Sequence, residues 1–123
     1  MSRALGDVAE ERAAQYLLGL GYILVTRGYT VKGGEIDIIA LDGDELVFVE
    51  VKSRKAGESG PEGSLSSSKM ECLRHAAEKY RSTMGETSRP FRFDLIAISE
   101  SELRHHIRLT FAEPVSRSGE YTA

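Results

Sequence analysis

Four charged residues stand at alternate positions of two neighbouring β-like segments, and their side-chain types suit a hard metal ion. Glu35 and Asp37 lie in the first segment, and Glu50 and Lys52 lie in the second. Two carboxylates held side by side repel each other unless a proton or a cation separates them. Mg²⁺ or Mn²⁺ binds hard oxygen ligands and leaves positions for water and phosphate. Asp37, Glu50 and Lys52 therefore predict a metal site that activates water against a phosphate ester.

The two segments that carry these residues predict a β-hairpin. Residues 35–41 and 46–52 alternate in polarity and are rich in β-branched residues, and Asp-Gly and Gly-Asp dipeptides lie between them. Because side chains on a strand alternate between faces, one face of the hairpin is wholly apolar. We expect this face to be buried, with the residues Ile36, Ile38, Ala40, Val47, Val49 and Val51.

The turn decides how the acidic residues meet, and two registers fit the sequence. If Gly43 and Asp44 form the turn, Asp37 lies directly opposite Glu50, with Cβ atoms about 5 Å apart. If Asp42 and Gly43 form the turn, Asp37 and Glu50 become diagonal neighbours. Both registers keep the charged groups on one face, whereas a three-residue loop with a bulge would separate them.

The rest of the chain supplies elements that surround this hairpin. Apolar residues at helical spacing predict helices over 7–20 and 67–84, the second with a capping box at Ser68 and Glu71. β-branched and aromatic runs predict an interrupted strand over 22–31 and later strands over 91–98 and 107–111. This order predicts an α/β fold, in which helices flank a central mixed β-sheet of about five strands.

Length and composition indicate a single domain that functions in a reducing compartment. The chain has 123 residues, of which 1–113 are expected to form the domain and 114–123 a flexible tail. The glycine-rich stretch 53–65 is expected to be a mobile loop. Cys72 is the only cysteine, and no leader or membrane-spanning run is visible, so we expect a cytoplasmic protein without a membrane partner.

Charge is spread unevenly along the chain. Residues 1–50 carry 4 Lys or Arg against 9 Asp or Glu, whereas residues 51–123 carry 12 against 10, and the total is −3. Tight, sequence-blind binding to DNA at high salt is not expected from this composition. Asp94 is expected to pair with an arginine such as Arg92 or Arg27. The three histidines show no metal-ligand spacing and are interpreted as ordinary side chains.

The hairpin motif resembles that of a known group of enzymes. Gly-Gly-Glu-Ile-Asp-Ile-Ile at 33–39, followed by Phe-Val-Glu-Val-Lys at 48–52, resembles the acid and Glu-x-Lys motif of the restriction-endonuclease-like, or PD-(D/E)xK, superfamily. From Gly6 to about Phe111 the chain is similar to the YraN-like family of predicted endonucleases. The resemblance implies a restriction-endonuclease-like three-layer sandwich.

The resemblance also implies roles for individual residues. Asp37 and Glu50 match the metal-binding acids, and Lys52 matches the catalytic lysine. Glu10 matches a helix glutamate that supports the metal in similar Holliday-junction resolvases, and Lys69 matches a position that contacts phosphate. Glu35 precedes the matched acid and is expected to support it. Met70 and Glu71 depart from the basic or polar residues that often follow Lys69 in the family.

Two hypotheses of different classes follow. The first is a Mg²⁺-dependent endonuclease that hydrolyses DNA phosphodiester bonds, with branched DNA as a substrate by analogy with the resolvases. Arg54, Lys55 and Lys69 would hold the DNA, and a homodimer would grip two strands. The alternative is a non-catalytic nucleic-acid- or protein-binding module that retains the nuclease fold.

Overall fold

The computed structural model describes residues 2–54 and 65–111, and it describes side chains over 8–53 and 65–111. The predicted tail over 114–123 and most of the predicted loop over 53–65 lie outside the described residues. Within the described residues the predicted α/β class is confirmed. Seven elements follow in the expected order: α1 (Ser2–Gly19), β1 (Ile23–Val31), β2 (Gly34–Asp42), β3 (Glu45–Arg54), α2 (Ser67–Thr83), β4 (Phe91–Ser99) and β5 (Glu102–Leu109).

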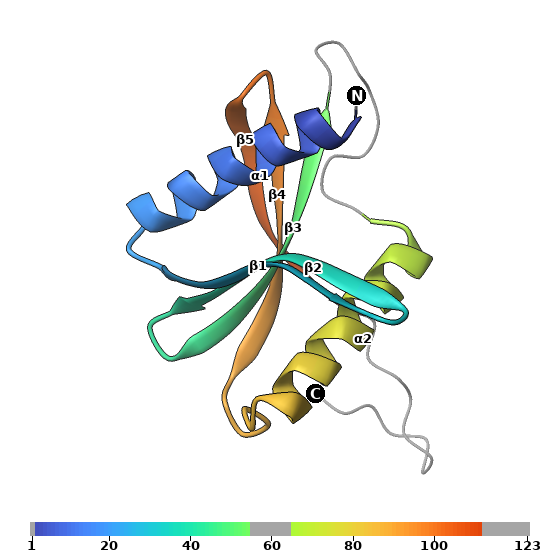
Figure 1. Ribbon diagram of the computed structural model, residues 1–123. Helices are drawn as coiled ribbons and strands as arrows, with labels where there is room; N and C mark the ends of the chain where they lie inside the picture. Colours follow the sequence, from blue (N-terminus) through green and yellow to red (C-terminus); the bar gives the residue numbers. More distant parts are fainter. Residues whose placement is uncertain (1, 55–64, 112–123) are drawn as a thin grey trace.

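The strands form one mixed sheet that lies between the two helices (Figure 1). The strand order is β1-β2-β3-β4-β5. Neighbouring strands are antiparallel except β3 and β4, which are parallel and are joined through α2. A parallel pair needs such a crossover because its strands run in the same direction. The predicted three-layer sandwich with a five-stranded mixed sheet is confirmed.

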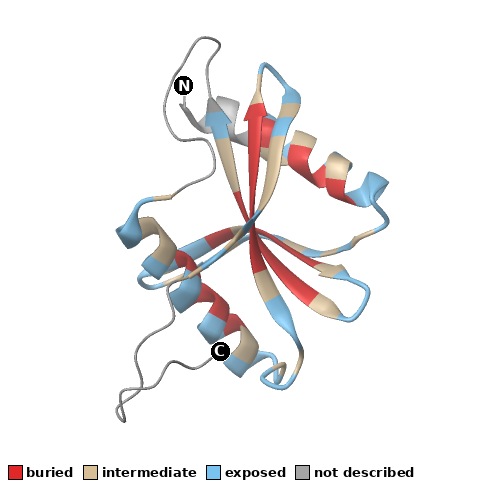
Figure 2. Cartoon of the chain, turned by 180° about the vertical axis from the view of Figure 1, so that it is seen from behind, coloured by how far each residue is buried: buried red, intermediate tan, exposed pale blue. Residues whose placement is uncertain are grey.

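Each helix covers its own hydrophobic core, and buried residues follow the middle of the sheet (Figure 2). On the α1 side, helix residues including Ala13 and Leu17 pack on Ile38, Val49 and Ile96. The core on the α2 side has a more aromatic composition. Its buried members are Ile36, Ile39, Leu46, Phe48, Leu73, Ala76, Ala77, Tyr80 and Phe93.

The β2–β3 hairpin adopts the first of the two predicted registers. Asp42 pairs with Glu45, so Gly43 and Asp44 form the turn, and the pairing continues to Ile38 and Val49. Gly43 has a φ of 61°, which a tight hairpin turn requires and glycine tolerates. This register brings Asp37 and Glu50 to the same end of the hairpin.

One expected face assignment is wrong. Ile36 was expected to share a face with Ile38, but Ile36 packs in the α2-side core, whereas Ile38 packs in the α1-side core. The register between β2 and β3 ends at Ile38, and the Asp37 side chain instead accepts a hydrogen bond from the Val51 backbone N–H. Regular alternation therefore breaks at Asp37, the residue of chemical interest.

Two further local expectations are corrected. The N-cap of α2 is Ser66, whose hydroxyl accepts from the Lys69 backbone N–H at 3.2 Å, rather than Ser68 of the predicted capping box. The last strand begins at Glu102, five residues before the predicted start. A tight turn at Glu100 and Ser101, both with positive φ, precedes it. The sequence did not indicate a strand over this part of β5 because an edge strand with a partly solvated face contains many polar residues.

Gly34 allows β2 to cross α2 at very close range. A Cβ built at Gly34 would clash with the Cys72 carbonyl oxygen and press on Ala76. We expect Gly34→Ala to lower the free energy of unfolding by about 3 kcal/mol, because a helix backbone must move to make room. Urea denaturation measures this change. Gly19→Ala is the control, since its Cβ would meet nothing within 4 Å; equal stability of both variants would contradict the close-packing argument.

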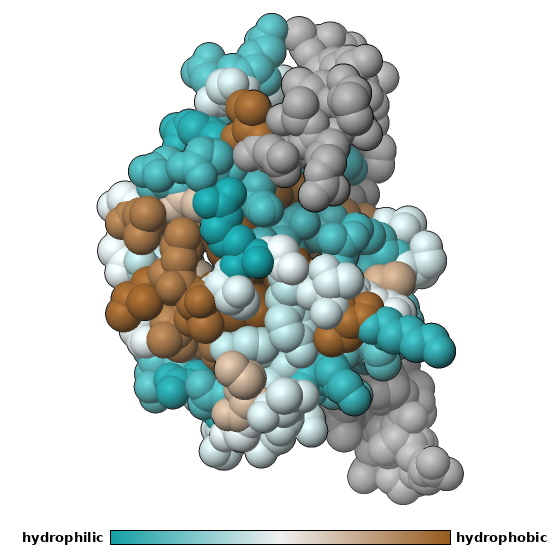
Figure 3. Space-filling model, viewed as in Figure 1, coloured by the Kyte–Doolittle hydropathy of each residue, from teal (hydrophilic) through white to brown (hydrophobic). Residues whose placement is uncertain are grey.

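An exposed apolar patch lies where α1 ends and β1 begins, and it is visible as the brown area in Figure 3. Its members are Leu18, Leu20, Ile23 and Val25, which are 40% to 62% exposed. Among the described residues, no helix is both long and apolar enough to cross a bilayer.

Candidate active site

Asp37 and Glu50 form a buried carboxyl pair at the end of the β2–β3 hairpin. Glu50 is only 7% exposed, and Asp37 is half-buried. The two carboxyl groups are close enough to share a hydrogen bond when one of them carries a proton. The Val51 backbone N–H donates to Asp37 Oδ2 at 2.8 Å and fixes the orientation of that carboxylate. The two acids predicted from the sequence are therefore brought together.

Lys69 of α2 completes this cluster from the other side. Its ammonium Nζ lies 3.3 Å from Glu50 Oε2, and it also interacts electrostatically with Asp37. The other oxygen of Glu50, Oε1, is buried and has no hydrogen-bond partner among the described residues. A buried carboxylate oxygen without a donor is unfavourable, so this atom favours a proton or a cation beside it.

Burial and mutual repulsion shift the titration of the pair. Burial, reinforced by the negative charge of Asp37, raises the pKa of Glu50 to about 8. Burial also raises the pKa of Asp37, although the hydrogen bond from Val51 opposes the change. Burial alone would lower the pKa of Lys69, but the charge and hydrogen bond of Glu50 outweigh it and raise that pKa. The pair thus holds a proton at neutral pH unless a cation replaces it.

This arrangement predicts a pH-dependent stability of the metal-free protein. A carboxyl whose folded pKa is raised stabilises the fold below its unfolded pKa of about 4.5, and that stability is lost as pH rises through about 8. We expect the free energy of unfolding to fall over this window by on the order of 3 kcal/mol relative to Glu50→Gln. Urea denaturation in EDTA from pH 5 to 8.5 measures it, and parallel curves for both proteins would refute the shift.

The other predicted site residues lie on β2, β3 and α1. Glu35 is exposed on β2, and its negative charge raises the pKa of both Asp37 and Lys69. Lys52 is half-buried on β3, two residues beyond Glu50, which places it on the same face by strand alternation. Glu10 is half-buried on α1, and its carboxylate lies 3.9 Å from Arg27 Nε of β1.

Two predicted nucleic-acid contacts cannot be placed as side chains. Arg54 is the last residue of β3 and pairs with Ser99, and its side chain lies outside the described residues. Lys55 lies outside them altogether.

A divalent cation would fit the pair chemically. Asp37 and Glu50 offer hard oxygen atoms, and one of these oxygens is buried without a donor. No group of three or more His, Cys, Asp or Glu side chains that could hold a metal is present in the described part of the chain. A cation here would therefore rest on two carboxylates, which suits Mg²⁺ because it completes its shell with water and phosphate oxygens.

A second charged cluster lies on the opposite face of the sheet, the face that α1 covers. Asp94 is buried between Arg92, whose Nε donates at 3.1 Å, and His106, whose Nε2 lies 2.6 Å away. The predicted pairing of Asp94 with Arg92 is confirmed. Arg92 also donates to the Tyr22 hydroxyl at 2.6 Å, and the Tyr16 hydroxyl lies 2.9 Å from His106 Nδ1. This network ties α1 to β4 and β5.

Comparison with known proteins assigns the chain to a family. The profile of the uncharacterised protein family UPF0102 matches residues 9–98. The chain belongs to the UPF0102 family. It is 38% identical over 99 residues to a UPF0102 protein of Symbiobacterium thermophilum, covering 80% of this chain and 84% of that protein. It is 41% identical over 105 residues to one from Pseudomonas putida, covering 82% of this chain and 81% of that protein.

The UPF0102 match confirms the resemblance at the level of the family. The matched segment contains every candidate site residue, from Glu10 to Lys69. It also contains the UPF0102 chain's second cluster as far as Asp94, but it ends before His106. Neither the family description nor the names of these relatives state an activity.

Sequence reasoning missed the contact between Lys69 and Glu50 in this UPF0102 chain. It assigned Lys69 to phosphate, whereas the structure places it beside a carboxylate. A signal for this contact exists in the order of elements. A helix that crosses over from β3 begins near the carboxyl end of that strand, where Glu50 also lies. The contacts of His106 with Asp94 and Tyr16 were missed for a different reason: the three residues lie on separate elements, and no spacing in the sequence links them.

Proposed function

We propose that this chain is a metal-dependent nuclease of the restriction-endonuclease-like type, which hydrolyses phosphodiester bonds in DNA. The observation that carries the proposal is the buried pair of Asp37 and Glu50, in which one oxygen has no donor. A structural ion pair needs only one carboxylate for each cation. Here two carboxyl groups converge on Lys69, so when both are ionised the cluster carries one negative charge more than Lys69 neutralises.

Each residue of the proposed site has its own role. Mg²⁺ or Mn²⁺ would supply Lewis acidity toward a phosphate oxygen and would acidify a water. Asp37 and Glu50 hold this charge in place, and Val51 keeps Asp37 in its orientation through the 2.8 Å hydrogen bond. Lys52 would stabilise negative charge on the phosphate or orient water. Glu35 adds negative potential at the rim of the pair.

A cleavage screen tests this function directly. Duplex, single-stranded, flap and four-way DNA are incubated with the protein in Mg²⁺ or Mn²⁺, with Glu50→Ala as the control. We expect cleavage of at least one substrate that needs both the metal and Glu50, with a branched substrate preferred. If none of the four substrates is cut, the result favours the non-catalytic binding module over the nuclease.

A non-catalytic binding module is the second candidate, and two observations favour it. The described residues supply only a two-carboxylate site, and Lys69 already partly neutralises it. The net charge of −3 also weakens general attraction to DNA. DNA binding that is unchanged by EDTA, together with absent cleavage, would select this function.

Lys69 should compete with a divalent cation for Glu50. Because its ammonium lies 3.3 Å from Oε2 and is 38% exposed, we expect Lys69→Met to tighten Mn²⁺ binding by about threefold. Isothermal titration calorimetry measures the affinity. Lys79→Met, on an exposed position of the same helix, removes an equal charge and should bind Mn²⁺ as wild type does. Weaker binding by Lys69→Met would mean that Lys69 supports the metal rather than opposing it.

A homodimer belongs to the same proposal, because one 13.5 kDa domain has little surface with which to hold two DNA strands. The apolar patch of α1 and β1 is the surface that favours self-association. Sedimentation velocity should show a dimer that Ile23→Lys converts to a monomer. A monomer at all concentrations would reject this part.

A further inference from the structure

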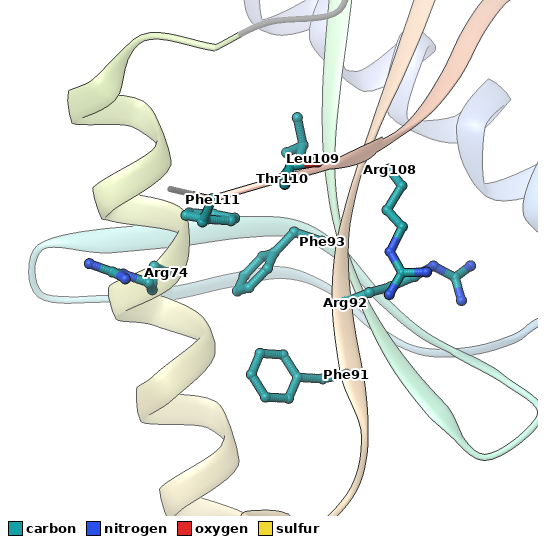
Figure 4. Close-up of a pocket in the computed structure, with 8 residues that line it drawn as sticks. All are labelled: Arg74, Phe91, Arg92, Phe93, Arg108, Leu109, Thr110 and Phe111. Carbon is teal, nitrogen blue, oxygen red and sulfur yellow. The ribbon is translucent and has the colours of Figure 1, made fainter. Parts of the chain in front are cut away.

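A second candidate binding site lies beside α2, where the end of β5 leaves the first residues of β4 without a neighbouring strand. Leu109 is the last residue of β5 and pairs with Phe93, so the first residues of β4 extend beyond their neighbour. A pocket of about 350 Å³ opens at this edge, with Phe91, Phe93 and Phe111 on one side of it (Figure 4). Its volume is at the small end of ligand pockets and suits a single planar group rather than a peptide.

The lining of this pocket is aromatic and positively charged. The ring centroids of Phe93 and Phe111 are 4.6 Å apart, and Phe91 is 36% exposed. Arginines complete the lining, with Arg74 from α2 and Arg92 and Arg108 from the sheet, and no acidic residue is among the eight that line it. This combination fits a ligand that has a flat apolar part and a negative charge.

Two of the three arginines are exposed enough for their guanidinium groups to bind a phosphate. Arg92 is fully engaged with Asp94, Glu45 and its other partners in the buried network. Arg74 and Arg108 are 45% and 69% exposed as side chains, and their carboxylate partners lie at 3.2 and 3.9 Å on the surface. Such exposed pairs are weak, so a phosphate can replace the carboxylates at little cost.

Arg81 lies on the same flank of α2, and its Nη2 donates to the Thr87 carbonyl oxygen at 2.8 Å. Its guanidinium lies 4.0 Å from the ring centroid of Phe91, and its Nε is buried without a hydrogen-bond partner among the described residues. Arg74 and Arg81 are seven residues, or two turns, apart, so both lie on the flank of α2 that faces the aromatic rings. A negatively charged strand laid along this flank would meet both.

The carboxyl pair lies near the other end of α2. Lys69 is in the first turn of α2 beside Glu50, whereas Arg81 is in its last turn beside Phe91. In the parallel β3–β4 register Glu50 pairs with Leu95, so Phe93 lies about 7 Å before it along the strands and one strand spacing of about 4.8 Å across. This straight line passes through the buried core, so a strand on the surface needs at least two or three nucleotides to span it, because a stacked strand advances about 3.4 Å for each nucleotide.

We infer that the pocket binds an unpaired base of single-stranded DNA, which stacks on Phe111 while Arg74 and Arg108 hold the flanking phosphates. The inference rests on the proposed function and narrows it: the substrate has an unpaired nucleotide at least two or three positions from the bond that is cut. Stacking of a base on an aromatic side chain is tolerant of sequence, so the site selects for single-stranded character rather than for a base.

Fluorescence anisotropy with a short labelled oligothymidine in EDTA and low salt tests the inference without the metal. We expect Phe111→Leu to weaken binding by about tenfold, and we expect Arg108→Gln to weaken it by about threefold and lower the salt dependence by about one unit of slope. Arg104→Gln is the matched control, because it removes an exposed arginine of the same strand outside the pocket. Arg74→Gln, at a well exposed side chain, replaces Phe111→Leu if that variant fails to fold.

An oligonucleotide of abasic residues separates stacking from charge. On it the effect of Phe111→Leu should vanish, while that of Arg108→Gln should remain. Equal binding of all variants, equal losses in Arg104→Gln and Arg108→Gln, or binding of acidic aromatic peptides in place of DNA would overturn the inference. The proposed nuclease would survive that result if Glu50-dependent cleavage persisted. Conversely, Phe111-dependent binding without any cleavage would reject the nuclease alone.

Discussion

Glu50→Gln is expected to lower the rate of metal-dependent DNA cleavage by on the order of a thousandfold while making the metal-free protein more stable at pH 8. The amide is nearly isosteric, so the packing around Phe48 and α2 should persist. It cannot take a negative charge, and therefore cannot hold a divalent cation with Asp37. The same change removes a buried carboxyl whose ionisation the fold resists, because its pKa is raised to about 8 by burial and by Asp37.

The opposite signs of the two effects make this variant diagnostic. Cleavage is measured as single-turnover rate on the best substrate of the screen, and stability is measured by urea denaturation in EDTA. Glu78→Gln, at an exposed position of α2, should change neither quantity. If Glu50→Gln cleaves as fast as wild type, the carboxyl pair is not the active site; if it is less stable at pH 8, Glu50 serves mainly as a partner for Lys69.

Arg92→Met is expected to cause the largest loss of stability of any single change discussed here, about 3 to 5 kcal/mol. The side chain is 12% exposed and donates to Asp94, Asp42, Glu45 and Tyr22. Removing it leaves Asp94, which is 2% exposed, without its arginine partner, although the contact with His106 remains. Chemical denaturation measures the loss.

Two comparisons show whether a buried charge causes this loss. Arg89→Met removes an arginine that also contacts two carboxylates, but its side chain is 30% exposed, so we expect a much smaller loss of stability than for Arg92→Met. The double variant Arg92→Met with Asp94→Asn should recover part of the stability, since no uncompensated carboxylate remains. Equal losses in the two arginine variants, or no recovery in the double variant, would contradict this account.

Local sequence rules predicted the arrangement of the acidic residues well. The turn dipeptides limited the hairpin to two even registers, and both kept Asp37 and Glu50 on one face. The observed register, with Gly43 and Asp44 in the turn, is one of these two. The order of elements predicted the sandwich because periodicity and turn residues act over short distances.

Features that depend on contacts between distant elements could not be predicted in this way. Ile36 lies on the other face than expected because the Asp37 carboxylate accepts a hydrogen bond from the Val51 backbone N–H and interrupts the strand pairing. The alternation of polar and apolar residues in the sequence does not reveal this interruption. The pairing of Lys69 with Glu50 depends on where the crossover helix begins. The pocket beside Phe111 arises because β5 stops two residues short of its neighbour, and strand ends are poorly marked in a polar edge strand.

The parallel pairing of β3 with β4 has a consequence for the order of folding during synthesis. β1, β2 and β3 are joined by short turns, so both acidic residues of the pair emerge early and can meet through local contacts. Lys69 and the partner strand β4 emerge later, and their contacts require closure of a longer loop. The nascent hairpin therefore carries both of its carboxyl groups before Lys69 of α2 can reach Glu50.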